Sequence, residues 1–109
     1  MREIKFRFWQ PFTKKMIYPK NGEGTFNDLQ EKEDWKVMQY TGLKDKNGKE
    51  IYESDYLLCD GRTFEVKWHK EQGCWEYYLV SKNWSPKMYC NPRESEVIGN
   101  IYENRDLLK

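Results

Sequence analysis

The segment from Thr63 to Val80 constrains the fold more than any other. A single strand register within it pairs opposite charges on one face and apolar side chains on the other. The two halves of the segment flank the turn-forming residues 70–73, and a four-residue loop there sets His69 opposite Cys74. The same register sets Lys67 opposite Glu76, a pair of opposite charge. On the other face it gives the apolar pairs Trp68–Trp75, Val66–Tyr77 and Phe64–Leu79. We therefore predict an antiparallel hairpin in this register.

Strand patterns also flank this hairpin. Residues 3–9 alternate, with Ile4, Phe6 and Phe8 on one face and Lys5 and Arg7 on the other, which predicts a half-buried strand. After the interruption at Pro11, residues 16–18 are predicted to form a short partner strand. The other predicted strands are 35–40, 56–59 and 96–102, with Gly99 as a candidate bulge.

Turn-forming residues separate these strands. A two-residue loop after 56–59 would set Leu57 opposite Phe64, whereas a three-residue loop would set Leu58 there, so both registers remain open. Residues 45–49 predict a tight turn and 19–34 a flexible loop with a short helical turn near Leu29. Residues 81–95 are expected to be irregular, and Asn104 to cap a short C-terminal helical turn.

The composition favours a compact fold with a core of few, large side chains. The 109 residues fit a single domain, 1–109, in which only 38% are hydrophobic but 17% are aromatic. Three widely spaced cysteines do not make a disulfide framework, and the N-terminus has no apolar signal segment. We expect a cytoplasmic protein with no membrane segment.

Together these patterns predict an all-β, or β-dominated, domain. We expect a small twisted sheet or an open barrel, with a short C-terminal helical turn. Residues 52–55, the following strand, the Gly turn and residues 65–68 resemble the pattern of small SH3-like barrels. Such barrels carry many unrelated functions, so this resemblance implies a fold only.

Three sequence blocks resemble the YopX-like proteins of phages and prophages. The central block is Met38–Asp55, and the ends are Arg2–Trp9 and Val97–Asn104. They follow one another in family order and cover about half of the chain. The resemblance implies a phage or prophage gene product in a bacterial host, and it brings no known activity. Ser54 departs from it, since the family usually has Gly there, which argues against a positive φ at this position. Gln10-Pro11-Phe12 also replaces the usual polar, acidic turn.

No catalytic, cofactor or metal site is predicted, and no small-molecule substrate. His69 and Cys74 are predicted neighbours, but a structural zinc site needs about four ligands, and no Cys-x-x-Cys pair is present. We interpret His69 as a surface residue beside a strand cysteine. Residues 45–49 mimic the start of a calcium loop, yet the downstream acidic ligands are missing, so a plain turn is preferred. The chain is not expected to be an enzyme.

Aromatic and basic residues form the candidate binding surface. Its members are Trp9, Lys14, Lys15, Tyr18, Lys36, Tyr40, Lys44, Lys46 and Lys49. We expect protein–protein contacts, either self-assembly into a homo-oligomer or binding of a phage or host protein, because aromatic rings are enriched in interfaces. The alternative is a nucleic-acid-binding module that stacks bases on these rings. The net charge of +1 weakens this alternative. A third interpretation makes the rings core residues and the lysines solvated strand tips.

Overall fold

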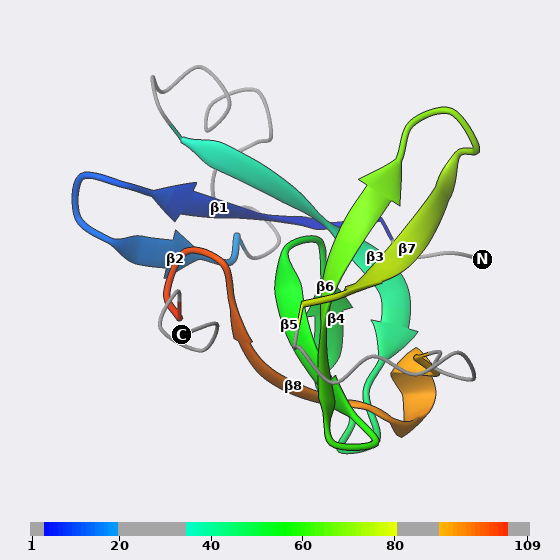
Figure 1. The fold of residues 1–109 in the computed structure, drawn as a ribbon. Helices are drawn as coiled ribbons and strands as arrows, with labels where there is room; N and C mark the ends of the chain where they lie inside the picture. The colour runs from blue at the N-terminus through cyan, green and yellow to red at the C-terminus, as the bar shows by residue number, and fades with distance from the viewer. Residues whose placement is uncertain (1–3, 20–34, 81–89, 105–109) are drawn as a thin grey trace.

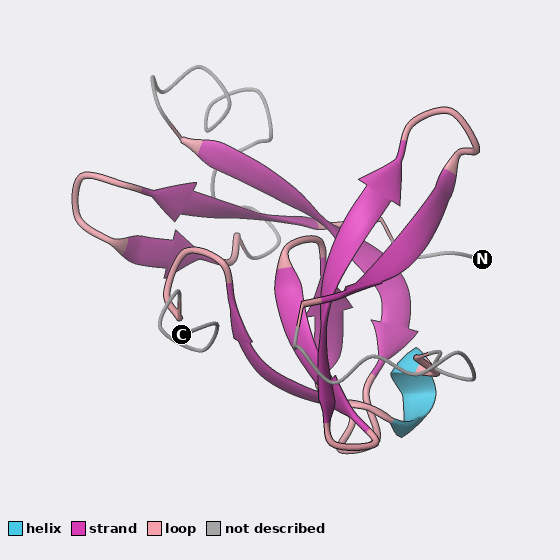
Figure 2. Ribbon diagram, in the orientation of Figure 1, coloured by secondary structure: helices cyan, strands magenta, loops and turns pink. Residues whose placement is uncertain are grey.

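The computed structural model describes residues 4–19, 35–80 and 90–104. Their strands form two four-stranded antiparallel sheets in the orders β2-β1-β3-β4 and β7-β6-β5-β8 (Figures 1 and 2). These sheets curl into a half-barrel, which confirms the all-β prediction. The helical turn that the structure describes is a 3-10 turn at Pro92–Glu94, not at the C-terminus. The predicted loop at 19–34, apart from Pro19, and the predicted turn after Asn104 lie outside the described residues.

The first sheet contains strands β1 (Phe6–Gln10), β2 (Lys15–Ile17), β3 (Lys36–Lys44) and β4 (Glu50–Tyr52). β1 pairs with β2 and β3, with Phe8 opposite both Ile17 and Val37. β3 continues four residues beyond its predicted end, past Gly42, where positive φ accompanies a register irregularity. β4 was not predicted, because three residues are too few to show alternation.

One side of β1 contradicts the sequence prediction. The sequence placed Arg7 on the solvent-facing side of this strand, but Arg7 is only 3% exposed. Trp9 on the same face and Phe8 on the opposite face are also buried. The strand is therefore covered on both faces rather than half-buried. Ile4, predicted on the apolar face, lies before the strand and is 69% exposed.

The second sheet contains β5 (Asp55–Cys59), β6 (Arg62–His69), β7 (Cys74–Leu79) and β8 (Glu96–Asn100). Every pair predicted between β6 and β7 is confirmed, from Phe64–Leu79 to His69–Cys74. Between β5 and β6 the two-residue loop is the one that forms, with Leu57 opposite Phe64. Leu58 therefore lies on the face of β5 opposite to Leu57 and is 37% exposed. At this position one face of β5 is open to solvent.

Two irregular points of the backbone shape the second sheet, a positive φ at Ser54 just before β5 and a bulge at Gly99 in β8. Ser54 has a φ of 74° despite its side chain, so the expectation drawn from its departure from Gly was wrong. Its N–H donates to Val66 and its carbonyl accepts from Ile101, which fixes this conformation from both sides. The bulge predicted at Gly99 is confirmed, because β5 pairs Tyr56 with Gly99 but Leu57 with Val97.

The hydrophobic core lies between the curled strands. Its central cluster is Ile51, Leu57 and Val66, all at 0% exposure. Partly buried side chains pack around it, namely Leu43, Trp75, Tyr77, Cys90 and Val97. Burial of these side chains removes a large apolar area from water, which is the main term that stabilises a domain this small.

Candidate functional site

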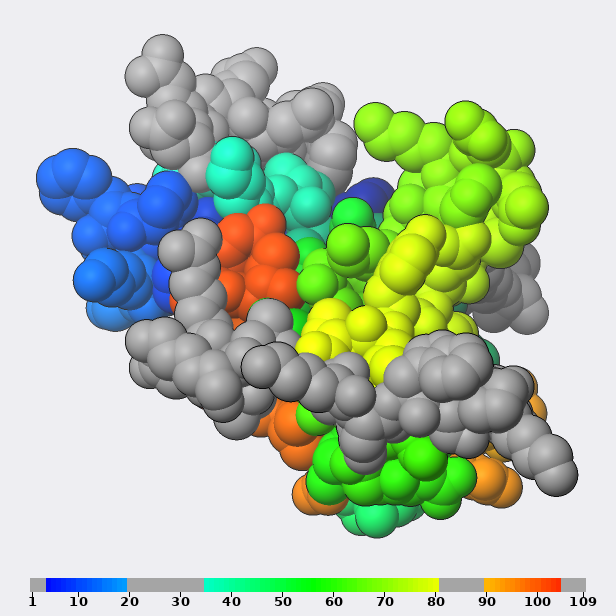
Figure 3. All heavy atoms as spheres, in the orientation of Figure 1, coloured from blue at the N-terminus to red at the C-terminus, as the bar shows by residue number. Residues whose placement is uncertain are grey.

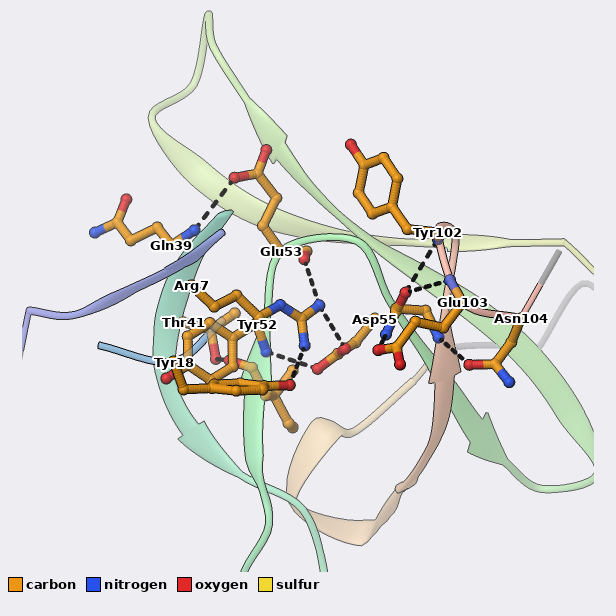
Figure 4. A network of polar contacts seen from close by, with 12 residues as sticks. Arg7, Tyr18, Gln39, Thr41, Tyr52, Glu53, Asp55, Tyr102, Glu103 and Asn104 are labelled. Atoms are coloured by element: carbon orange, nitrogen blue, oxygen red, sulfur yellow. Dashed lines mark hydrogen bonds and ion pairs between the residues drawn. The ribbon is translucent and has the colours of Figure 1, made fainter. Parts of the chain in front are cut away.

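The polar centre of the molecule is an ion pair between the sheets. Arg7 Nη2 lies 2.7 Å from Asp55 Oδ1, and both side chains are almost completely buried (Figure 4). Arg7 also donates to the carbonyl of Glu53 and the hydroxyl of Tyr18, and its guanidinium lies over the Tyr52 ring. The other oxygen of Asp55 accepts the Tyr52 N–H at 2.8 Å. The cation is thus matched by an internal carboxylate and is not free to attract an external anion.

Burial sets the proton affinities in this centre. It raises the pKa of Asp55, although the Arg7 charge and the hydrogen bonds to Asp55 oppose the rise. Burial also raises the pKa of Glu53, although the hydrogen bond from the Gln39 N–H and the charge of Arg7 act to lower it. It raises the pKa of Tyr52 to about 12. Since both carboxylates accept hydrogen bonds from neighbours, Asp55 from Arg7 and Tyr52 and Glu53 from Gln39, we interpret the centre as the link that joins the sheets rather than as reactive machinery.

Two hollows border this centre. The larger, of about 490 Å³, is lined by Trp9, Pro11, Lys14, Tyr102 and Glu103. The Trp9 and Tyr102 rings stack there with centroids 5.6 Å apart. The smaller, of about 240 Å³, includes Arg7, Tyr18, Lys49 and, again, Glu103. Both hollows contain acidic as well as basic side chains, Lys14 and Glu103 in the larger and Arg7, Lys49, Asp55 and Glu103 in the smaller, so neither presents a field of one sign.

The structure divides the predicted candidate binding surface. Its lysines, Lys14, Lys15, Lys36, Lys44, Lys46 and Lys49, are all exposed. Tyr18 is 49% exposed, but Trp9 and Tyr40 are buried at 7% and 4%. Trp9 and Lys14 meet at the larger hollow, and Tyr18 and Lys49 at the smaller one. The burial of Trp9 and Tyr40 agrees with the interpretation of these two rings as core residues.

The sequence patterns did not identify two exposed aromatic side chains on the β6–β7 hairpin, Trp68 and Tyr78. β6 and β7 extend away from the rest of the molecule (Figures 1 and 3). Trp68 is 40% exposed there and Tyr78 45%. Together they line a shallow hollow of about 280 Å³, here called the hairpin surface: Lys67, Trp68, His69, Lys70, Glu71 and Tyr78. The confirmed register accounts for Tyr78, which it places on the charged face of the hairpin, whereas Trp68 lies on the opposite, apolar face next to Trp75.

Neighbouring contacts hold the rings of the hairpin in place. Trp68 packs edge-on against Trp75 with centroids 4.9 Å apart, and Lys67 Nζ lies 4.9 Å from the centre of the Tyr78 ring. Such contacts restrict the rings before any partner arrives, which lowers the entropy cost of binding. The hairpin surface is therefore ordered, aromatic and mixed in charge.

His69 and Cys74 lie opposite each other, as predicted. His69 Nδ1 accepts the Gln72 N–H at 3.0 Å, and Nε2 lies 3.4 Å from Glu76. Both ring nitrogens therefore have neighbours other than the thiol. Among the described residues, no group of three or more His, Cys, Asp or Glu could hold a metal ion. Within the same ranges, no helix is long and apolar enough to cross a membrane.

Asp45 organises the predicted turn at 45–49. Its Oδ1 accepts the N–H groups of Asn47 and Lys49, and its Oδ2 accepts that of Val97 at the start of β8. Burial would raise the pKa of Asp45, but these three hydrogen bonds outweigh it and hold the pKa below its usual value. The carboxylate is occupied by backbone groups, in keeping with a structural turn.

These features define a small all-β protein whose polar centre is internal and whose exposed rings lie on a projecting hairpin. The family model described as YopX protein matches residues 19–109, so the chain belongs to the YopX family. A crystal structure of protein EF1440 from Enterococcus faecalis is similar over 100% of both chains, with a TM-score of 0.70 and 24% identity. This likeness shows the shared fold. No curated protein matches the sequence.

Proposed function

We propose that this protein is a small accessory protein that acts by binding another protein through the hairpin surface. The observation that carries the proposal is the exposure of Trp68 and Tyr78 on a hairpin that extends beyond the core. Tyr and Trp are enriched at the centres of protein interfaces because they contribute large contact areas at low entropy cost. The resemblance to phage and prophage proteins supports a role for such an accessory protein in a phage-infected or lysogenic bacterial cell.

The charges favour a protein partner over a nucleic acid. The hairpin surface combines Lys67 and Lys70 with Glu71, and the whole chain has 19 basic and 18 acidic residues. Nucleic-acid affinity comes chiefly from the neutralisation of phosphates, which needs a basic field. Single-strand binding also needs open ring faces, and Trp9 and Tyr40 lie in the core.

Affinity capture with matched variants tests the proposal. The wild-type protein, Trp68→Ala, Tyr78→Ala and Phe12→Ala would each be immobilised and incubated with bacterial lysate, with and without nuclease. Phe12 is the control, because it is 97% exposed but lies outside the hairpin surface. We expect a protein that Phe12→Ala retains and that Trp68→Ala and Tyr78→Ala lose, regardless of nuclease.

Two results would contradict the proposal. Equal retention by all four proteins would show that the hairpin surface does not bind the captured partner. Capture abolished by nuclease would favour the nucleic-acid alternative instead. A titration with single-stranded DNA at low and physiological salt would then follow, since phosphate contacts weaken steeply with salt.

A further inference from the structure

We infer that the outer edge of β7 pairs with β7 of a second copy of this chain, in an antiparallel, two-fold symmetric ladder. The inference goes beyond the proposed function, because it concerns the strand edge formed by Trp75, Tyr77 and Leu79 and a second copy of the chain, not the hairpin surface and a different protein. Four strand edges end the two sheets, those of β2, β4, β7 and β8.

Three of the edges carry features that hinder pairing. β2 has three residues, begins at the exposed Lys15 and directly follows the exposed Lys14. In β4 the Tyr52 N–H is taken by Asp55. In β8 the N–H groups of Val97 and Asn100 are taken by Asp45 and Asn104, and a bulge interrupts the strand. Side-chain acceptors and irregular backbone are common protections against edge-to-edge association.

β7 lacks these protections. Its six residues, Cys-Trp-Glu-Tyr-Tyr-Leu, contain one charge and neither lysine nor proline. Val80 N donates to Thr63 O, so the pairs 63–80, 65–78 and 67–76 are the hydrogen-bonded pairs of the β6–β7 ladder. The backbone N–H and C=O groups of Trp75, Tyr77 and Leu79 therefore point away from β6. Among the residues that the structure describes, none forms a hydrogen bond with these outward groups.

The outward residues form a self-complementary pattern centred on Tyr77. An antiparallel partner with Tyr77 opposite Tyr77 of the second copy sets Trp75 opposite Leu79, and the reverse. All of these pairs have outward backbone groups, so the ladder gains about six hydrogen bonds, two for each facing pair. On the other face, Glu76 lies beside Tyr78 of the second copy, over whose ring that copy holds its own Lys67. Opposite charges thus meet across the two-fold axis.

Charge over the whole molecule does not oppose this association. The net charge is +1, so two copies repel each other only weakly. Trp75 and Tyr77 already pack against the core cluster, and pairing would continue their apolar face into that of the second copy. A partner strand added to a free edge is a general mode of recognition in which backbone bonds provide affinity and side chains set the register.

The test uses two substitutions at one position. Tyr77→Ala and Tyr77→Pro both remove the ring, but only proline removes the outward N–H, and no hydrogen bond to β6 is lost. Sedimentation velocity over a wide concentration range would give the dimer dissociation constant of each. We expect dimers for the wild type and Tyr77→Ala, and a dissociation constant about tenfold to a hundredfold higher for Tyr77→Pro. Near-ultraviolet circular dichroism would verify folding.

Cross-linking keeps the inference testable if the proline variant does not fold. In this register position 77 faces its own copy at about 5.5 Å between Cα atoms, within disulfide range. The native Cys74, which is exposed, would lie about 20 Å from its counterpart, six strand positions away. Copper-catalysed air oxidation should therefore link Tyr77→Cys/Cys74→Ser into a covalent dimer, and leave the wild type unlinked.

Other outcomes overturn the inference. A wild type that stays monomeric at high concentration would refute it, yet would leave binding of a different protein by the hairpin surface intact. Dimers of equal affinity for Tyr77→Ala and Tyr77→Pro would place the interface elsewhere. Conversely, a dimer that Tyr77→Pro weakens and Tyr77→Ala does not, together with no Trp68-dependent capture, would support the β7 ladder and reject the heterologous partner.

Discussion

At the residue scale, the carboxylate of Asp45 joins the turn at 45–49 to β8. Three N–H groups donate to it, those of Asn47, Lys49 and Val97, and they lower its pKa in the folded state. A carboxyl with a lowered folded pKa stabilises the protein above its unfolded pKa, near 3.9, and the benefit disappears as pH falls through the folded pKa. The stabilisation should therefore be complete at neutral pH.

Asp45→Asn should expose this dependence. We expect a loss of about 1–3 kcal/mol in the free energy of unfolding at pH 7, because a neutral amide accepts the backbone N–H groups less well. The difference from wild type should shrink as pH falls below about 4, where the carboxyl of the unfolded chain is protonated first, and should disappear below the lowered folded pKa. Urea unfolding between pH 7 and 3 measures it. Asp60→Asn, at an exposed position, serves as control, and a difference independent of pH would contradict the interpretation.

Ser54 offers a test of backbone strain. Its φ of 74° lies in the left-handed region, and hydrogen bonds to Val66 and Ile101 hold it there. Ser54→Ala and Ser54→Gly both remove the hydroxyl, but only glycine adopts this φ without a steric cost. We expect the glycine variant to be more stable than the alanine variant by about 1 kcal/mol. Chemical denaturation measures the difference, and a more stable alanine variant would mean that this φ carries no strain.

At the element scale, the β6–β7 hairpin has two parts. Near Val66, Trp75 and Tyr77 it packs on the core, whereas its turn, residues 70–73, extends beyond it. Local opening costs less free energy where fewer apolar contacts must be broken. We expect the amides that bond within the 67–76 and 69–74 pairs to exchange at least about a hundredfold faster than those between β5 and β6. Hydrogen-exchange mass spectrometry or NMR would show it, and uniform protection would contradict it.

The same element shows how far the sequence determines the fold. The β6–β7 register was predictable because charge and apolarity alternate together on both strands, which only one pairing accommodates. β4 has three residues and therefore shows no period. β3 continues past Gly42 through an irregularity that alternation does not encode. Local patterns thus predict strands that are long enough for the alternation of charged and apolar residues to repeat. They do not predict very short strands, or the part of a strand that continues past an irregularity.

At the scale of the whole molecule, the decisive contact joins residues far apart in sequence. Arg7 alternates with apolar residues as a solvent-facing side chain would, and its partner Asp55 lies 48 positions away. No local pattern predicts that pairing, and so the polar centre was missed. The exposure of Trp68 likewise depends on where the core ends. Sequence therefore predicted the strands well, but it did not predict which faces the two sheets bury against each other.

Because the Arg7–Asp55 pair joins the sheets, its loss should weaken the whole molecule. Arg7→Met leaves a buried carboxylate without its cation, and we expect the free energy of unfolding to fall by about 3–5 kcal/mol. Adding Asp55→Asn should restore part of this loss, since no buried charge then remains. Lys5→Met, which removes a half-exposed ion pair with Glu50, should cost about 1 kcal/mol or less.

The effect should be global rather than local. In Arg7→Met, amide protection should fall by the same factor in β1 and β3 of the first sheet and in β5 and β6 of the second, because both sheets unfold together. The Trp9–Tyr102 stack supports this expectation, since it ties β1 to the residues that follow β8. Hydrogen exchange in low urea measures both sheets in one experiment. Loss of protection confined to the first sheet would show that the two sheets are separate folding units and that the Arg7–Asp55 pair does not couple them.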